Sequence, residues 1–261
     1  FTIIRSPKSY NSQVGVPLSV WQLQAQHSLA IFEAGVSQKG EMDKLEKIIQ
    51  PTLGVLTNIG EAHADGFMDI QEKLNEKAIL FQTASAVICS NEKLNGLSFA
   101  HTNIYSWGKE NGNTIIIKKI AKQFAQTNID FTTGSLNDTI TIPFIDDASI
   151  ENAITCLSVC CYLQIPIEEL KEKFSQLRPV SLRLELKSGL HNTTIINDSY
   201  SADLSSFIIA LNMLQQQRQH PGKTVILSDF SLSADQEQTA YTSIATLIES
   251  HFVKRLITVG E

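Results

Sequence analysis

The stretch from Leu53 to Lys77 reads LGVLTNIGEAHADGFMDIQEKLNEK and joins a short apolar run to a helix through a polar loop. The run Leu53–Thr57 is bounded by turn residues, which is typical of a buried strand. Asp69 lies three residues before Glu72, the spacing of a helix-capping box, so a helix is predicted from there to about Gln82. A strand followed by a loop and a helix indicates an α/β fold.

A second apolar run, Leu29–Glu33, precedes this stretch and ends in a carboxylate. Between the two runs, Met42–Gln50 carries apolar residues at helical spacing. Strand, helix and strand at this length predict a parallel βαβ unit whose strands end on the same edge of the sheet. Ligands of open α/β sheets bind at that edge, so we expect the site there.

The rest of the chain is predicted to extend this sheet and then to begin another. Ser85–Cys89 and Thr102–Ser106 read as further strands of the first sheet. Three β-branched runs separated by turn residues predict appended antiparallel strands, and two helices follow them. The strands are Thr114–Ile120, Ile129–Thr133 and Thr139–Phe144, and the helices are Ile150–Leu163 and Ile167–Leu177.

A second α/β unit is predicted after Pro179 and Ser181, which mark a hinge. It has three strands taken as parallel and two helices, so it reads as an incomplete Rossmann-like domain. We therefore divide the chain into domains 1–182 and 183–261, and the apparent strands at both ends suggest a piece of a longer protein. The strands are Thr193–Asn197, Thr224–Leu227 and Leu256–Val259, and the helices are Ser205–Gln217 and Gln236–Ser250.

The composition is that of an ordinary globular protein. Charged residues are 18% of the 261, with 27 acidic and 21 basic side chains, so no basic patch for nucleic acid or for an anionic membrane is indicated. No apolar run approaches the ~20 residues that cross a bilayer, and no signal peptide opens the chain. We expect a soluble, cytoplasmic protein with no membrane insertion.

The four cysteines show neither CxxC spacing nor the density of a disulfide-rich scaffold. Cys156, Cys160 and Cys161 lie at helical spacing, and the fourth, Cys89, ends an apolar strand. We interpret all four as buried, reduced thiols rather than as metal ligands or redox groups.

Glu33 and His63 are candidate metal ligands because both follow strands that end at the expected binding edge. Mg²⁺ takes few protein ligands and prefers hard oxygens, and a neutral imidazole can also coordinate a metal. Asp65 is a further candidate oxygen, with weaker support. Each residue also has a simpler reading: Glu33 as an exposed turn carboxylate and His63 as a hydrogen-bonding loop residue.

Lys77 lies on the half-apolar helix after this loop, where a lysine usually extends its stem over apolar neighbours. A functional reading requires that it captures CO2, because a carbamate exchanges the cation for an anionic oxygen ligand. At a pKa of about 10.4 only about one amine in 2,500 is neutral at pH 7. Partial burial and a nearby cation would both lower that pKa and favour the carbamate.

The runs EAGVSQKGE (Glu33–Glu41), TNIGEAH (Thr57–His63) and Glu76-Lys77 resemble the central domain of the Mur ligases. SYNSQVGVP (Ser9–Pro17) resembles the segment after their nucleotide loop. The chain is most similar to the branch of the family that adds D-alanyl-D-alanine to UDP-N-acetylmuramoyl-tripeptide. The resemblance implies an α/β central domain, a partial Rossmann-like C-terminal domain, and an ATP-dependent carboxylate–amine ligase of peptidoglycan precursor synthesis.

The resemblance also implies a role for each site residue. Metal binding would fall to Glu33, His63 and a carbamylated Lys77, which are also the catalytic set. The nucleotide contacts would be Asn58, Asn152 at the adenine, Arg183 at a phosphate, Asp198 at the ribose, and Tyr200. The cofactors would be ATP and Mg²⁺, with the carbamate supplied by CO2. The chain departs from the family at Ala148-Ser149, Ser37-Gln38, Leu182, Ser201 and Asp203.

One family motif is absent: no GxxxxGK[ST] phosphate loop occurs in the sequence. We expect it to precede Phe1, and we expect these residues alone to be inactive. A fused alanine racemase beyond Glu261 is compatible with the resemblance. Two alternatives stay open, another Mur or folylpolyglutamate synthase-like ligase, and a noncatalytic binding module.

Overall fold

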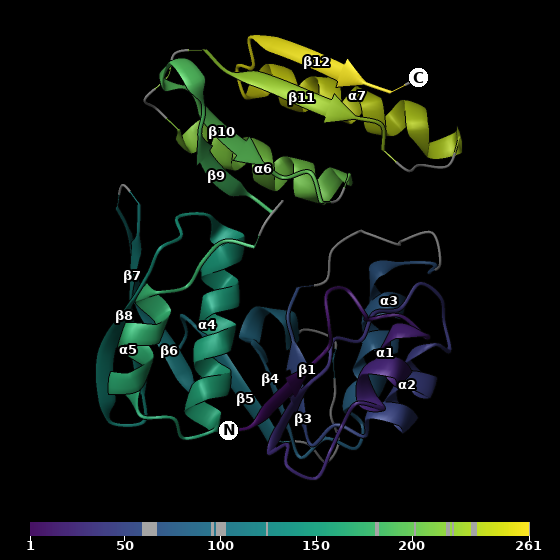
Figure 1. The fold of residues 1–261 in the computed structure, drawn as a ribbon, viewed down its shortest axis with the longest axis vertical. Helices are drawn as coiled ribbons and strands as arrows, with labels where there is room; N and C mark the ends of the chain where they lie inside the picture. Colours follow the sequence, from purple (N-terminus) through teal and green to yellow (C-terminus); the bar gives the residue numbers. More distant parts are fainter. Residues whose placement is uncertain are drawn as a thin grey trace. The chain divides into compact units, whose positions relative to one another are not determined.

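The chain folds into two compact units, each described here by itself (Figure 1). A computed structural model describes residues 1–58, 67–94, 97, 103–123, 125–180, 183–200, 202–217, 220, 222–230 and 234–260. The first unit comprises Phe1–Ile142 and Glu151–Ser175, and the second comprises Pro143–Ile150 and Gln176–Glu261. The predicted α/β fold class is confirmed.

The first unit is built on a six-stranded sheet with the strand order β3-β4-β5-β6-β7-β8. Neighbouring strands from β3 to β6 run parallel, and β6, β7 and β8 are antiparallel. The predicted mixture of a parallel sheet with appended antiparallel strands is therefore confirmed. The strands are β3 (Leu53–Leu56), β4 (Ala86–Ser90), β5 (Asn103–Gly108), β6 (Ile115–Lys122), β7 (Thr127–Thr133) and β8 (Leu136–Ile142).

Strands β1 (Ile3–Arg5) and β2 (Leu29–Ile31) form a separate parallel pair. Among the described residues, β2 pairs only with β1 and β3 pairs only with β4. The prediction that the strands at 29–33 and 53–57 belong to one sheet is therefore wrong. The apolar pattern identifies each strand and the helix between them, but it does not determine which strand lies beside which.

Helices α1 (Gly15–Val20), α2 (Met42–Ile49) and α3 (Ile70–Ala78) complete the first half of this unit. The Asp69 side chain accepts the Glu72 N–H at 2.7 Å, so the predicted capping box begins α3 as expected. A 3-10 turn, η2 (Ile79–Phe81), then extends it. One apolar cluster joins α1 to α2 through Val16, Val36, Met42 and Leu45, and another joins α3 and η2 to the sheet through Leu56, Leu74, Phe81 and Val87.

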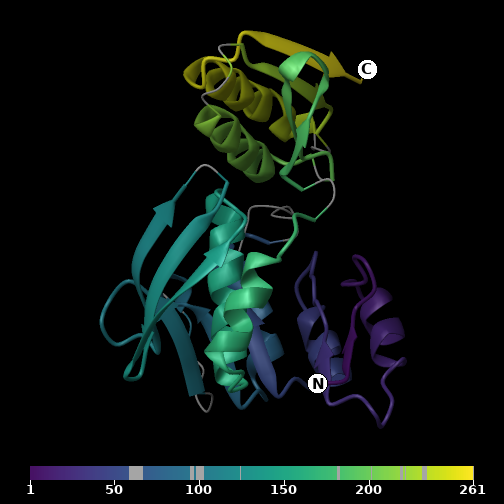
Figure 2. The same cartoon turned by 60° about the vertical axis from the view of Figure 1, so that its left-hand side comes forward.

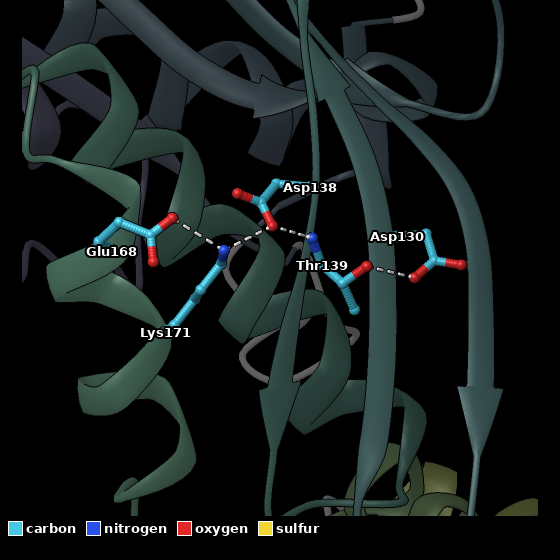
Figure 3. A network of polar contacts seen from close by, with 5 residues as sticks. All are labelled: Asp130, Asp138, Thr139, Glu168 and Lys171. Atoms are coloured by element: carbon cyan, nitrogen blue, oxygen red, sulfur yellow. Dashed lines mark hydrogen bonds and ion pairs between the residues drawn. The ribbon is translucent and has the colours of Figure 1, made fainter.

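Helices α4 (Asp147–Tyr162) and α5 (Ile167–Ser175) cover one face of the sheet near its antiparallel strands (Figures 1 and 2). A polar network ties α5 to β8 (Figure 3). Lys171 Nζ lies 2.9 Å from Asp138 Oδ1 and 3.0 Å from Glu168 Oε1. Thr139 on β8 donates to Asp130 on β7 at 2.7 Å, so the network fastens two strands and a helix together.

The second unit contains two separate two-stranded sheets and two helices. β9 (Glu185–Ser188) and β10 (Thr194–Asn197) are antiparallel, whereas β11 (Thr224–Ser228) and β12 (Arg255–Val259) are parallel. Because β10 pairs with β9, which was not predicted, the prediction of three parallel strands is wrong for the described residues. Helices α6 (Leu204–Gln216) and α7 (Ala234–Ser250) enclose a core with Phe207, Leu211, Phe230 and Ile244.

In the part of the chain that the structure describes, no helix is long and apolar enough to cross a membrane. The remaining short helices are η3 (Asn91–Leu94) and η4 (Leu190–Asn192).

Candidate functional site

Glu33 lies two residues beyond β2, where the chain enters a loop, and its side chain is exposed. Asn11 holds it in place, because its Nδ2 donates to Glu33 Oε1 at 2.8 Å. The Asn11 carbonyl also accepts the Gly35 N–H at 2.7 Å, so one residue fixes both the carboxylate and the following turn. Asn11 received no role from the sequence, although it lies inside the segment Ser9–Pro17.

The loop after Glu33 is held by a second carboxylate, Glu41. Glu41 Oε2 accepts the backbone N–H groups of Ser37 at 2.7 Å and Gln38 at 3.0 Å. The Gln13 amide donates to the Glu41 carbonyl at 3.2 Å, which ties the loop to the segment before α1. The loop therefore has a defined path from β2 to the start of α2.

Lys77 lies in the last turn of α3 and is half-buried. Burial lowers the pKa of its amine, and the charge of Glu33 partly opposes this effect. Lys77 and Glu33 are thus brought close enough to interact electrostatically, as the sequence predicted. A half-buried lysine with a lowered pKa is the chemical state that carbamylation requires.

The residue before Lys77, Glu76, is a buried carboxylate with an exposed fraction of 4%. Its Oε1 accepts the N–H of Met42, the first residue of α2, at 2.8 Å. The free N–H groups of a helix start stabilise a negative charge, so this contact explains how the carboxylate is tolerated inside the unit. It fixes α3 against α2 and hence the position of Lys77.

Asn58 is exposed and follows β3 by two residues. It takes part in an interaction whose partner is not described. His63 and Asp65, the other predicted residues of this loop, lie outside the described residues. Among the residues that are described, no group of three or more His, Cys, Asp or Glu side chains could hold a metal ion.

Asn152 lies in the second turn of α4 with its side chain exposed. Asp146, just before the helix, accepts the Ser149 N–H at 2.7 Å and so caps the helix start. Asn152 therefore stands on a firmly begun helix, in the position predicted for it.

Arg183, Asp198 and Tyr200 come together in the second unit. The Arg183 guanidinium carbon lies 4.1 Å from the centre of the Tyr200 ring, a cation–π contact. Asp198 Oδ1 accepts the Leu184 N–H at 3.0 Å. Burial raises the pKa of Asp198, while the Leu184 N–H and Arg183 oppose that rise. Three residues predicted as nucleotide contacts are thus neighbours.

The four cysteines are free thiols. Cys89 is buried as predicted, but Cys156 is exposed, so the prediction of a fully buried set is wrong. The reason is that Cys156 lies on the solvent side of α4, one turn after Asn152.

The fold and the Glu33–Lys77 pair are those of a Mur-type ligase domain. The Mur ligase middle domain matches residues 1–160, and the chain belongs to the Mur ligase family. The chain is 25% identical to UDP-N-acetylmuramoyl-tripeptide–D-alanyl-D-alanine ligase of Bacillus subtilis, over 100% of this chain and 57% of that protein. It is 27% identical to the ligase of the same name from Borreliella burgdorferi, over 92% of this chain and 52% of that protein.

Solved structures agree on the fold. MurF from Acinetobacter baumannii superimposes with a TM-score of 0.85 at 21% identity, over 99% of this chain and 58% of that chain. MurF ligase from Thermotoga maritima in complex with ADP gives 0.79 at 18% identity, over 100% and 64%. The FPGS of L. casei is less similar, with a TM-score of 0.59 at 15% identity, over 89% and 64%. The chain thus spans little more than half the length of the curated relatives named above.

Proposed function

We propose that this chain is the central and first C-terminal part of an ATP-dependent ligase that adds D-alanyl-D-alanine to UDP-N-acetylmuramoyl-tripeptide in peptidoglycan precursor synthesis. Relatives with this name align along 92–100% of the chain. The observation that carries the proposal is the electrostatic pairing of half-buried Lys77 with Glu33 beyond β2. The functional division proposed is a central domain at 1–182 and a C-terminal domain at 183–261.

The proposed reaction has two steps. A carboxylate oxygen of the tripeptide attacks the γ-phosphorus of ATP, which releases ADP and forms an acyl phosphate. The amine of D-alanyl-D-alanine then attacks the acyl carbon, phosphate leaves, and the amine proton passes to solvent or a base. The charge that develops on the transferring phosphoryl group requires preplaced cations rather than a protein nucleophile.

Mg²⁺ would supply that positive charge when bound, and the donor chemistry of the described residues fits it. Glu33 offers a hard carboxylate oxygen that Asn11 already orients. We propose His63 as a second ligand. Lys77 becomes an oxygen donor only after its neutral amine adds to CO2, which forms an N-carboxylate and releases one proton.

The nucleotide would contact residues of both units. We propose that Asn58 and Asn152 lie at the ATP site of the first unit, Asn152 at the adenine. In the second unit, the Arg183–Tyr200 pair presents a cation suited to phosphate, and Asp198 presents an acceptor suited to a ribose hydroxyl. Water would be excluded from the acyl phosphate when the C-terminal domain closes on the nucleotide.

The phosphate loop is not part of the sequence given, because no GxxxxGK[ST] occurs in it. We propose that the full-length protein supplies this loop, and we expect negligible ATP turnover from the 261 residues alone. A fused alanine racemase is a further proposal for the whole protein, and the sequence of the complete gene tests both.

The test is a substrate panel on the full-length protein with phosphate release as the readout. We expect release that requires ATP, UDP-N-acetylmuramoyl-tripeptide and D-alanyl-D-alanine together. Turnover with a folate and glutamate, and none with the muramoyl peptide, would instead assign a folylpolyglutamate synthase, the alternative that the similarity to FPGS favours. No turnover with any set would leave a noncatalytic module.

Lys77→Met in that protein tests the site itself. We expect at least a hundredfold loss of kcat, because the anionic carbamate and its support for the metal are lost. The matched control is Lys47→Met on α2, whose side chain is 68% exposed and pairs with Asp43. Equal activity of the two variants would remove Lys77 from the mechanism.

A further inference from the structure

Helix α4 exposes only a narrow stripe of its surface. Along its length the exposed residues are Asp147, Asn152 and Cys156, and the others are buried or half-buried. Residues four apart lie on the same face of a helix, so Asn152, Cys156 and half-buried Cys160 follow one another along the stripe. The prediction that these thiols are inert core residues misses this stripe.

The thiols of Cys156 and Cys160 form a hydrogen-bonded pair. This contact lowers the pKa of Cys156 to about 7, against the effect of burial, and raises the pKa of Cys160. The pair therefore holds one proton loosely near neutral pH. The other two thiols differ, because burial raises the pKa of Cys89 and of Cys161 to about 11.

We propose that Cys156 and Cys160 form a two-thiol site for soft, thiol-seeking ligands of the trivalent arsenical class. The two sulfurs point from one helical face and already touch, so a single soft atom can bridge them without unwinding α4. An arsenoxide reacts with two thiols: two S–H bonds break, two As–S bonds form, and the oxygen leaves as water. Arsenic stays trivalent, so no oxidant is needed.

The site deepens the proposed function, on which this step rests. Cys156 follows Asn152 by one helical turn, about 6 Å along the axis. A group bridged between Cys156 and Cys160 would project from the stripe that carries the proposed adenine contact. Occupation of the thiol site is therefore expected to block nucleotide binding.

Phenylarsine oxide tests the site on the 261-residue chain by intact mass and thiol counting. We expect one arsenical per chain, two fewer free thiols, resistance to excess 2-mercaptoethanol, and release by a dithiol. Cys156→Ser and Cys160→Ser should each lose the resistant adduct, and Cys161→Ser should keep it, with circular dichroism confirming that each variant is folded. No resistant adduct on the parent chain, or its loss in Cys161→Ser, would overturn the site.

Nucleotide binding by the full-length protein tests the link to Asn152. We expect the arsenical to weaken ADP binding at least tenfold, the dithiol to restore it, and Cys156→Ser to be insensitive. An adduct that leaves ADP affinity unchanged would overturn the link and leave the thiol site standing. Absence of ADP binding before any treatment would count against the proposed function, while the mass measurement still decides the site.

Discussion

At the scale of the residue, Lys77 shows how burial prepares a side chain for chemistry. An ordinary lysine is almost entirely protonated at neutral pH, and a protonated amine cannot add to CO2. Burial lowers the pKa of Lys77, whereas Glu33 limits the effect. The sequence predicted the need for this shift but not its balance, because the depth of one side chain depends on packing that no local pattern encodes.

Carbamylation of Lys77 should therefore occur at lower pH than that of an ordinary lysine. The neutral fraction of an amine rises as pH approaches its pKa, so a lowered pKa moves the rise downward. The measurement is trapping of the carbamate in bicarbonate, followed by peptide mass spectrometry across a pH series. Lys47 is the internal control, because its bond to Asp43 raises its pKa. Equal labelling of both lysines at every pH would contradict the prediction.

Asn11 offers a second prediction at this scale. Asn11→Ala removes the donor that orients Glu33, so activity of the full-length protein should fall about 10–100-fold, the usual effect of losing a group that orients a metal ligand. Stability should change by only about 1 kcal/mol. Asn75→Ala, an exposed asparagine on α3, is the control. If both variants keep full activity, Asn11 does not position Glu33.

At the scale of the element, local chemistry was predictable and pairing was not. The start of α3 follows from Asp69 and Glu72, because a capping box is a contact between near neighbours in sequence. The pairing of β10 with β9 could not be read, since the four residues Glu185–Ser188 have no apolar alternation. Strand partners are chosen by contacts between distant segments, which a single sequence does not display.

The contact between α3 and α2 can be tested at Glu76. Glu76→Ala leaves the buried Met42 N–H without its acceptor, which should cost about 1–3 kcal/mol of unfolding free energy. Glu76→Gln keeps an acceptor oxygen and should cost clearly less. Urea denaturation measures both, with exposed Glu110→Ala expected within about 0.5 kcal/mol of the parent chain. A cost as large for Gln as for Ala would show that charge, not the hydrogen bond, is what matters.

At the scale of the whole molecule, the predicted site residues divide between two units. The sequence placed a boundary near Pro179, and contacts assign residues from Gln176 onward to the second unit. They also assign Pro143–Ile150, the segment entering α4, to that unit. This last feature was beyond prediction, because it depends on contacts between segments more than 30 residues apart in sequence.

The two units should respond separately to core mutations. Leu45→Ala in the first unit and Leu211→Ala in the second each remove a fully buried side chain, which typically costs about 2–5 kcal/mol. Trp21 and Trp107, the chain's two tryptophans, both belong to the first unit, so their fluorescence follows that unit alone. In urea, Leu45→Ala should shift the fluorescence transition, and Leu211→Ala should shift only part of the circular dichroism transition. Coincident shifts for both variants would show one cooperative unit.

The unpaired edges of β2 and β3 have a practical consequence. In the described part of the chain each strand has a hydrogen-bonded neighbour on one side only, and Ile31 and Val55 are 53% and 37% exposed. Open strand edges with apolar side chains template the addition of strands from other molecules. Solutions of this 261-residue chain should therefore age, with light scattering that grows with protein concentration and storage time, and a short peptide that binds the edges should slow that growth.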